Sequence, residues 1–386
     1  MLPASAAVVG HVRTLRIALD ATPLLGLPTG VGAFTAGVLT SLADRDDVEV
    51  AAYALTWRGR GTLPSAVPPG VRVVDRPMPA RPLRAVWRGA DFPRVESWTG
   101  PVDVVHGTNF VVPPARAAEI VTVHDLTALR FPELCDRQTL AFPQLIRRAL
   151  RRGAWVHAPS AHVAAEIREA FAVPVDRVVV VHEGVPAVDA APAGAGQRLA
   201  GADRYVLALG TIEPRKDHVG LLAAFEAVAA GDGDVRLVLA GAHGWGADAF
   251  DAALARSPVR DRVVLSGYVG AADRAALLRD AAVLAFASRY EGFGLPPLEA
   301  MSVGVPVVAT DAGALPEVLG DAAILVPVGD RDALAEALSS ALHDDARRQR
   351  LVRAGAAQAA RYSWDACADG LVALYRAAVE QRECGG

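Results

Sequence analysis

Two glutamates in the last third of the chain have the spacing and surroundings of a ligand site. Glu291 and Glu299 are separated by seven residues. The continuous apolar run 281–287 before them predicts a buried parallel strand. Two prolines just before Glu299 predict the start of a helix, because a proline in the first helical turn loses no hydrogen bond. The pattern predicts a strand, a glycine turn and a helix, with the two carboxylates bracketing the turn and the first helical turn.

The same turn predicts an anion-binding site. The backbone N–H groups of Phe293, Gly294 and Leu295 fall at the expected helix start, where they can donate to a bound anion. A lone pair of glutamates at this spacing would more simply be a solvated loop residue and a surface helix residue. The glycines, the prolines and the strands expected at 281–287 and 306–309 favour the site.

A second strand, turn and helix carries two cations. Residues 205–209 predict a strand, Gly210 begins the turn, and Arg215 and Lys216 precede a helix that starts near Val219. Lys216 is the only lysine in the chain. Arginine forms forked hydrogen bonds and lysine supplies a compact charge, so the pair suits a diphosphate. The alternative interpretation is a solvated basic pair.

Polar side chains also follow strands expected in the first half. His106 ends the run 103–106, and His124 ends the run 120–124 with Asp125 directly after it. Ligands of open parallel sheets bind at the carboxyl ends of the strands. We therefore expect His124 and Asp125 near a ligand, and His106 either there or in a structural position.

Two glycines lie between the first expected strand and the first expected helix. Gly30 and Gly32 fall between residues 16–21 and 33–43. In a doubly wound fold this first turn faces the ligand crevice. An ordinary tight turn explains the same pattern equally well.

From Glu291 to Ala309 the chain reads EGFGLPxLEAMxxGxPVVA. This segment is similar to the signature of the family 4 retaining glycosyltransferases, which use nucleotide-sugar donors. The resemblance implies an α/β fold of the GT-B type: two Rossmann-like domains facing a cleft, with a C-terminal helix that crosses back to the first domain. It extends over nearly the whole chain, and its specific motifs lie in the second half.

The resemblance also implies roles for the residues named above. Glu291 would contact the donor sugar and Glu299 the ribose hydroxyls. Arg215 and Lys216, in an E-P-R-K pattern, would bind the donor phosphates. Further roles are implied for His124 near the donor sugar, for Gly30 and Gly32 near the phosphates, for Tyr268 and Val269 at the nucleotide base, and for Asp125 and His106 on the acceptor side.

Length and composition predict two domains. The chain has 386 residues, more than one hydrophobic core usually supports. With this length, the resemblance implies an acceptor-side domain at 1–190, a nucleotide-sugar domain at 191–365 and a returning helix at 366–386. The small, Pro/Gly-rich stretch 187–201 predicts an interdomain linker, and residues 1–13 predict a frayed tail.

Charge and hydropathy limit the binding partners and the cellular location that we expect. The net charge of −4 gives no support for nucleic-acid binding. No apolar run reaches the ~18 residues of a membrane span, and the start lacks the basic region of a signal peptide, so we expect a cytoplasmic protein. The Arg-rich segments 76–94 and 137–152 read as solvated or self-packed helices, or else as a peripheral contact with the inner face of a membrane.

A catalytic metal is not expected. The three Asp-x-Asp pairs, which begin at residues 44, 232 and 330, read as turns and helix caps. The three cysteines have no metal-ligand spacing. We expect no cofactor, with the nucleotide sugar as substrate.

The expected function is retaining, metal-independent transfer of a hexose to a hydroxyl of a glycan or glycolipid. The TGVG and GTIEPRK segments resemble those of bacterial mannosyltransferases of cell-wall assembly, which implies GDP-mannose as donor. Three alternatives stay open: a glucosyltransferase using UDP-glucose, a nucleotide-sugar hydrolase or epimerase of the same fold, and a non-catalytic nucleotide-binding protein.

Overall fold

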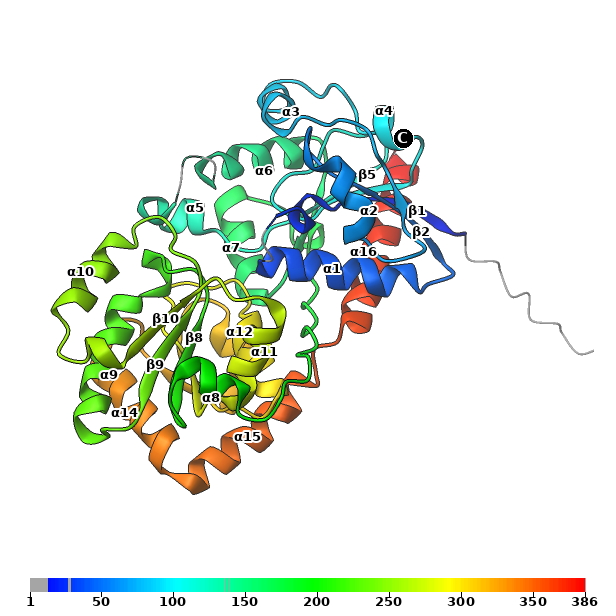
Figure 1. Ribbon diagram of the computed structural model, residues 1–386. Helices are drawn as coiled ribbons and strands as arrows, with labels where there is room; N and C mark the ends of the chain where they lie inside the picture. The colour runs from blue at the N-terminus through cyan, green and yellow to red at the C-terminus, as the bar shows by residue number, and fades with distance from the viewer. Residues whose placement is uncertain (1–12, 27–28, 136, 138, 386) are drawn as a thin grey trace, which may run out of the picture. The chain divides into compact units, whose positions relative to one another are not determined.

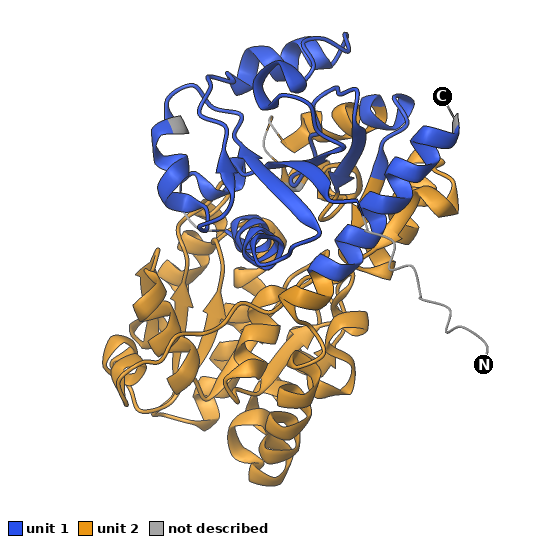
Figure 2. Ribbon diagram, turned by 90° about the vertical axis from the view of Figure 1, so that its right-hand side faces the viewer, with its two compact units in different colours: residues 1–122, 148–155, 368–386 blue, residues 123–147, 156–367 orange. Residues whose placement is uncertain are grey.

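Helices and parallel strands alternate along the chain (Figure 1). The computed structural model describes residues 13–26, 29–135, 137 and 139–385. All of the predicted tail 1–13 except Arg13 lies outside the described residues. The chain forms two compact units (Figure 2). Unit 1 comprises residues 1–122, 148–155 and 368–386, and unit 2 comprises residues 123–147 and 156–367.

The first sheet has seven strands in the order β3-β2-β1-β4-β5-β6-β7. Within unit 1 the pairs β1·β2, β2·β3, β1·β4 and β4·β5 are all parallel. The strand order changes direction at β1, because β2 and then β3 follow on one side of it and β4 to β7 follow on the other. The strands are β1 (Leu15–Asp20), β2 (Val48–Tyr53), β3 (Arg72–Val73), β4 (Val104–Gly107), β5 (Ala118–Thr122), β6 (Trp155–Ala158) and β7 (Val178–Val180).

The second sheet lies wholly in unit 2. Its six parallel strands have the order β10-β9-β8-β11-β12-β13. Every residue of β8 and β11 is buried, as expected of strands covered on both faces. The strands are β8 (Tyr205–Leu209), β9 (Arg236–Ala240), β10 (Val263–Gly267), β11 (Val283–Phe286), β12 (Val307–Thr310) and β13 (Ile324–Val326).

The α-helices connect these strands, and several begin at a side-chain cap. Ser160 accepts a hydrogen bond from the Val163 amide, and Asp330 accepts one from the Ala333 amide, so each satisfies a donor that the helix start leaves open. The helices are α1 (Gly30–Ala43), α2 (Leu63–Ala66), α3 (Ala80–Trp87), α4 (Glu96–Thr99), α5 (Thr127–Arg130), α6 (Phe142–Arg151), α7 (Ala161–Phe171), α8 (Ala195–Ala200), α9 (His218–Gly231), α10 (Asp248–Arg256), α11 (Ala271–Asp280), α12 (Leu295–Ser302), α13 (Leu315–Leu319), α14 (Arg331–His343), α15 (Asp345–Ala359) and α16 (Trp364–Gly385).

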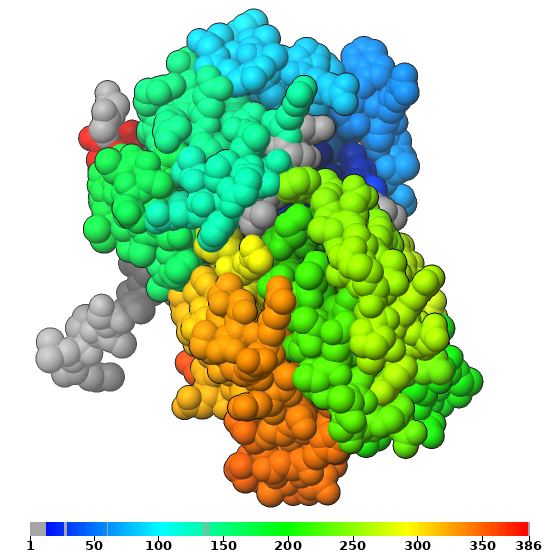
Figure 3. Space-filling view, turned by 90° about the vertical axis from the view of Figure 1, so that its left-hand side faces the viewer, coloured from blue at the N-terminus to red at the C-terminus, as the bar shows by residue number. Residues whose placement is uncertain are grey.

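Short 3₁₀ turns occur at several of the connections. They are η1 (Thr22–Leu24), η2 (Gly59–Thr62), η3 (Pro132–Leu134), η4 (Thr139–Ala141), η5 (Val175–Arg177), η6 (Pro214–Lys216), η7 (Arg260–Arg262) and η8 (Gly320–Ala322). In unit 2 the helices α14 and α15 (orange) form part of the face shown in Figure 3.

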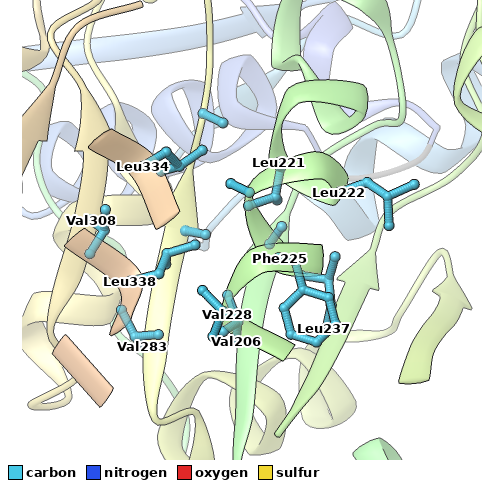
Figure 4. Packing of buried hydrophobic residues seen from close by; sticks show 14 of the residues in the cluster. Val206, Leu221, Leu222, Phe225, Val228, Leu237, Val283, Val308, Leu334 and Leu338 are labelled. Carbon is cyan, nitrogen blue, oxygen red and sulfur yellow. The ribbon is translucent and has the colours of Figure 1, made fainter. Parts of the chain in front are cut away.

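One core of unit 2 lies where α9 and α14 pack on the second sheet (Figure 4). Phe225 of α9 is fully buried between the strands and its helical neighbours. Truncating such a side chain to alanine typically costs about 3–5 kcal/mol. The labelled members of this cluster are Val206, Leu221, Leu222, Phe225, Val228, Leu237, Val283, Val308, Leu334 and Leu338.

One expected element boundary was wrong, and one helix was not predicted. The helix α1 begins at Gly30 rather than near Ala33, because Thr29 caps it through the Gly32 amide at 3.2 Å. The predicted linker 187–201 contains a helix, α8. An added Cβ at Gly196 would lie 2.3 Å from the Ala276 carbonyl oxygen, so the small residues of α8 permit close packing on α11.

The Arg-rich segment 76–94 forms the helix α3, which is anchored by its apolar residues. Leu83 and Trp87 are buried, and the Trp87 indole donates to the Pro93 carbonyl at 3.0 Å. Val86 and Phe92 are exposed. Within the described part of the chain, none of the helices combines the length and the apolar character that crossing a bilayer requires.

Candidate active site

A buried carboxylate lies between two cations in unit 2. Lys216 Nζ is 2.5 Å from Glu291 Oε1, and a guanidinium nitrogen of Arg215 is 3.1 Å from Glu291 Oε2. The Glu291 side chain is 10 % exposed and that of Lys216 is 13 % exposed. The two segments whose sequences predicted anion and diphosphate contacts therefore meet at one point.

The charges of this cluster are fixed by their surroundings. Burial by itself would raise the pKa of Glu291, but the positive charges of Lys216 and Arg215 outweigh it and lower the pKa to about 2. The Lys216 ammonium also lies 4.6 Å from the centre of the Phe286 ring, within the range of a cation–π contact. Glu291 is thus ionised across the neutral pH range.

Backbone geometry brings Arg215 and Lys216 to this position. The turn η6 is followed by Asp217, which has a left-handed φ of 46° and caps α9 by accepting from the Gly220 amide. The Arg289 amide donates to the Arg215 carbonyl at 2.8 Å. The Arg215 side chain in turn donates to the Tyr290 carbonyl at 3.0 Å. These bonds tie the basic turn to the segment that follows β11.

The glycine turn after Glu291 lies against the end of another strand. An added Cβ at Gly292 would be 1.7 Å from the carbonyl oxygen of His124, so only glycine fits there. The hydroxyl of Ser160 donates to the Gly292 carbonyl at 2.9 Å. Gly294 has a φ of 112° and precedes α12. The expected anion-binding segment Phe293–Leu295 is therefore held at the start of a helix.

His124 is oriented by a carboxylate. Its Nδ1 is 3.1 Å from Glu183 Oε1, and both side chains are largely buried. The neighbouring Asp125 accepts from the Thr127 amide at 2.9 Å, and its negative charge contributes to the raised pKa of Arg215, against the lowering effect of burial. His124 and Asp125 therefore lie beside the cluster of Arg215, Lys216 and Glu291.

Several residues of this site were missed from the sequence. Glu183 follows a histidine at the end of β7, which is the same sheet-edge position that singled out His124. Tyr290 accepts a hydrogen bond from the Leu126 amide at 3.0 Å and donates to Glu166. Tyr290 could have been noticed because it directly precedes Glu291 in the sequence. Glu166 lies on α7, and no sequence pattern points to it.

Glu299 is paired within the protein. It is buried on α12 and forms an ion pair with Arg274 of α11. Burial raises the pKa of Glu299, and the charge of Arg274 opposes this only in part. Tyr268 and Val269, the residues expected at the nucleotide base, follow β10, and Tyr268 is exposed.

The remaining expected site residues belong to unit 1. Gly30 and Gly32 lie in the first turn of α1, where an added Cβ at Gly32 would be 3.0 Å from the Pro23 carbonyl oxygen. His106 is fully buried, with Nδ1 2.6 Å from the Tyr375 hydroxyl and Nε2 2.7 Å from the Thr122 hydroxyl. This environment is that of a core histidine, because both ring nitrogens are engaged inside the unit.

An anion that reached Arg215 and Lys216 would meet two cationic side chains that Glu291 and Glu213 partly balance, in a buried setting where Coulomb attraction is stronger than in bulk solvent. Burial lowers the pKa of Lys216, and the negative charge of Glu291 opposes this effect. Such an arrangement can stabilise the charge that develops on a leaving phosphate group. Among the residues that the structure describes, no group of three or more His, Cys, Asp or Glu side chains could hold a metal ion.

The sequence matches two families of known proteins. Residues 28–188 match the family described as Glycosyltransferase Family 4, and residues 195–358 match the family described as Glycosyl transferases group 1. An O-antigen chain mannosyltransferase B of Escherichia coli is 31% identical over 283 residues, which cover 71% of this chain and 74% of that protein. A phosphatidyl-myo-inositol mannosyltransferase of Mycobacterium leprae is 36% identical over 195 residues, which cover 50% of each protein.

A solved structure has the same architecture. The Anabaena protein HepE, crystallised with UDP and glucose, superposes with a TM-score of 0.72 at 19% identity, covering 94% of this chain and 100% of that one. The two parallel α/β sheets and this likeness confirm the predicted fold class. The predicted family is confirmed as well: the chain belongs to family 4 of the glycosyltransferases and is a hexosyltransferase of the GT-B fold.

Proposed function

We propose that the protein transfers mannose from GDP-mannose to a hydroxyl group of a glycan or glycolipid, with retention at the anomeric carbon and without a catalytic metal. The observation that carries this proposal is the convergence of Arg215 and Lys216 on Glu291. The choice of mannose is supported by the names of the relatives from Escherichia coli and Mycobacterium leprae.

In the proposed reaction the protein acts through charge and orientation. Arg215 and Lys216 stabilise the diphosphate as the glycosidic bond to phosphate breaks, and the amides at the start of α12 add to this effect. The departing phosphate oxygen takes the proton of the acceptor hydroxyl on the same face of the sugar. Glu291 and His124 orient the donor sugar, and Glu299 binds the ribose of the donor.

A binding experiment tests the choice of donor. The melting temperature is measured with GDP, UDP, ADP and TDP, each with and without magnesium. A ligand present at about 100 times its dissociation constant adds about 2.7 kcal/mol to the free energy of unfolding. Stabilisation by GDP alone, without magnesium, is the expected result. A response to UDP would favour a glucosyltransferase, and a response to none of the four would contradict the nucleotide site.

Product analysis tests the reaction itself. The enzyme is incubated with GDP-mannose, with and without a mannose-containing acceptor, and the product is examined by proton NMR. We expect an α-linked mannoside only when the acceptor is present. Free mannose or an epimerised nucleotide sugar formed without acceptor would favour a hydrolase or an epimerase. A β-linked product would contradict retention.

For a glycolipid acceptor we propose a peripheral position at the inner face of a membrane, with α3 as the contact. This helix and the turn after it expose Val86 and Phe92, and the same segment carries Arg81, Arg84, Arg88 and Arg94 beside a single acidic residue, Asp91. Anionic lipids attract such segments by about 1 kcal/mol per basic residue. Flotation with anionic and with neutral vesicles tests this position, and equal recovery with both vesicle types would contradict it.

A further inference from the structure

A buried glutamate outside the recognised motifs lies against His124. Glu183 is 4 % exposed and its Oε1 is 3.1 Å from His124 Nδ1. The two residues follow different strands of the same sheet, since His124 comes two residues after β5 ends and Glu183 three residues after β7 ends. A buried carboxylate is costly unless it is hydrogen-bonded, so this contact is part of what keeps Glu183 there.

The turn that carries Glu183 is held firmly by the beginning of α16. An added Cβ at Gly184 would lie 2.5 Å from the backbone nitrogen and the ring of Trp364, so no larger residue fits. The Val185 amide donates to the Tyr362 carbonyl at 3.1 Å. The backbone of Glu183 is therefore held in place by contacts other than the one between its side chain and His124.

The contact determines which ring nitrogen of His124 carries a proton. A carboxylate only accepts hydrogen bonds, so Nδ1 must be the donor. In the neutral ring Nε2 is then the acceptor nitrogen. A hydrogen bond of this kind at one ring nitrogen fixes both the tautomer and the orientation of the ring.

The histidine that Glu183 orients lies at the candidate active site. The His124 carbonyl abuts Gly292, the residue next to Glu291. We propose that Glu183 is a positioning residue of the transferase: it holds His124 in the Nδ1–H tautomer and fixes its ring beside the donor sugar. This inference rests on the proposed function for its kinetic consequence, but the tautomer can be measured without any activity.

Nitrogen-15 NMR of the histidine rings tests the first part of the proposal. The signals of His124 are assigned by their loss in a His124→Gln variant. In the wild-type protein, we expect the neutral ring to be protonated at Nδ1. In Glu183→Gln the side-chain amide can donate as well as accept, so the Nδ1–H tautomer should lose population, whereas Glu183→Asp should keep it. A wild-type ring protonated at Nε2 would overturn the proposal.

Kinetics test the second part. Removing the carboxylate that orients a metal-bound histidine typically lowers activity by about 10- to 100-fold, and we expect a loss of the same order when the oriented histidine binds no metal. We expect Glu183→Gln to lower kcat by about this factor while KM for the donor and the melting temperature change little, and we expect Glu183→Asp to recover part of kcat. An unchanged kcat in Glu183→Gln, or losses in both variants that follow their melting temperatures, would overturn the proposal.

A matched control lies on the surface of the same unit. His243 and Asp251 form a pair of the same length, 3.1 Å, but both side chains are nearly half exposed. Asp251→Asn should change neither kcat nor the tautomer of His124. If no nucleotide sugar supports transfer, the proposed function fails, and the ring NMR still decides whether Glu183 positions His124.

Discussion

Glu291 is a carboxylate held between two cations, so its charge, and not only its size, supports the fold. Lys216 and Arg215 outweigh the effect of burial and lower its pKa from 4.5 to about 2. A carboxyl group whose pKa is lower in the folded state adds stability above its unfolded pKa. That stability is lost as the pH falls through the folded value. The difference corresponds to about 3 kcal/mol at neutral pH.

The first prediction concerns the pH dependence of this contribution. Glu291→Gln should lower the free energy of unfolding by about 3 kcal/mol at pH 7, because it removes the carboxylate paired with the buried Lys216 and leaves Arg215 only its ion pair with Glu213. The difference from the wild-type protein should shrink between pH 4.5 and pH 2, where the wild-type carboxyl group itself takes up a proton. Urea unfolding of both proteins at several pH values measures this. A difference that does not vary with pH would contradict the assigned charge state.

The turn between β11 and α12 requires a residue without a side chain at Gly292. The close approach of Gly292 to the His124 carbonyl leaves no room for a methyl group. Gly292→Ala should therefore displace the turn that carries Phe293 and Gly294, lowering the melting temperature and weakening stabilisation by a nucleoside diphosphate. Gly231→Ala, at the end of α9, is the control, because nothing lies within 4 Å of its added Cβ. Equal nucleotide binding by both variants would rule out this role of Gly292.

The helices α11 and α12 are joined by a charged pair. Arg274→Met would leave the buried carboxylate of Glu299 without its counter-charge. We expect a loss of about 2–3 kcal/mol, below the value for a fully buried pair because the Arg274 side chain is 33% exposed. Changing Glu299→Gln in addition should restore part of the stability, because no isolated charge then remains.

Urea unfolding of the two single variants and the double variant measures this coupling. Arg348→Met, which removes an exposed pair with Asp345, should change the free energy of unfolding by less than about 1 kcal/mol. If the loss of stability of the double variant relative to the wild-type protein equalled the sum of the two single losses, Arg274 and Glu299 would not be coupled.

At the scale of the whole molecule, the sequence predicted the strands better than the long-range contacts. Apolar runs such as the one around β11 identified both sheets, because parallel strands are buried on both faces. The residues Arg215, Lys216 and Glu291 were singled out in the sequence because each follows a strand next to glycines. Glu183 and Glu166 were not found, since they become important only through contacts with residues far away in the sequence.

Composition did not show where small residues serve close packing. The stretch 187–201 has the alanines and glycines of a linker, but Gly196 is small because α8 packs closely on α11. His106 was predicted from the same strand-end pattern as His124, but it lies in the core of unit 1. The pattern gives the position on a strand, whereas the side chains around that position decide whether a ligand can reach it.

A single lysine side chain allows the candidate site to be probed by chemical modification in the intact protein. Because Lys216 is the only lysine, an amine-specific reagent can modify only this side chain and the N-terminal amine. Lys216 is 13 % exposed and paired with Glu291, so modification requires local opening of unit 2. An opening free energy of about 3 kcal/mol would slow the reaction by about 100-fold relative to the unfolded chain.

The last prediction concerns the rate at which Lys216 is modified. With a short-chain acylating reagent, Lys216 should react much more slowly in the folded protein than in urea. A bound nucleoside diphosphate should slow the reaction further, because binding to the closed form suppresses opening. Peptide mass spectrometry gives the rate at Lys216, and the N-terminal amine serves as the internal control. Glu291→Gln should speed the reaction at Lys216, since it removes the partner that holds the ammonium group. Equal rates in the folded and unfolded protein would show that Lys216 reacts without local opening, which would contradict its burial in an ion pair with Glu291.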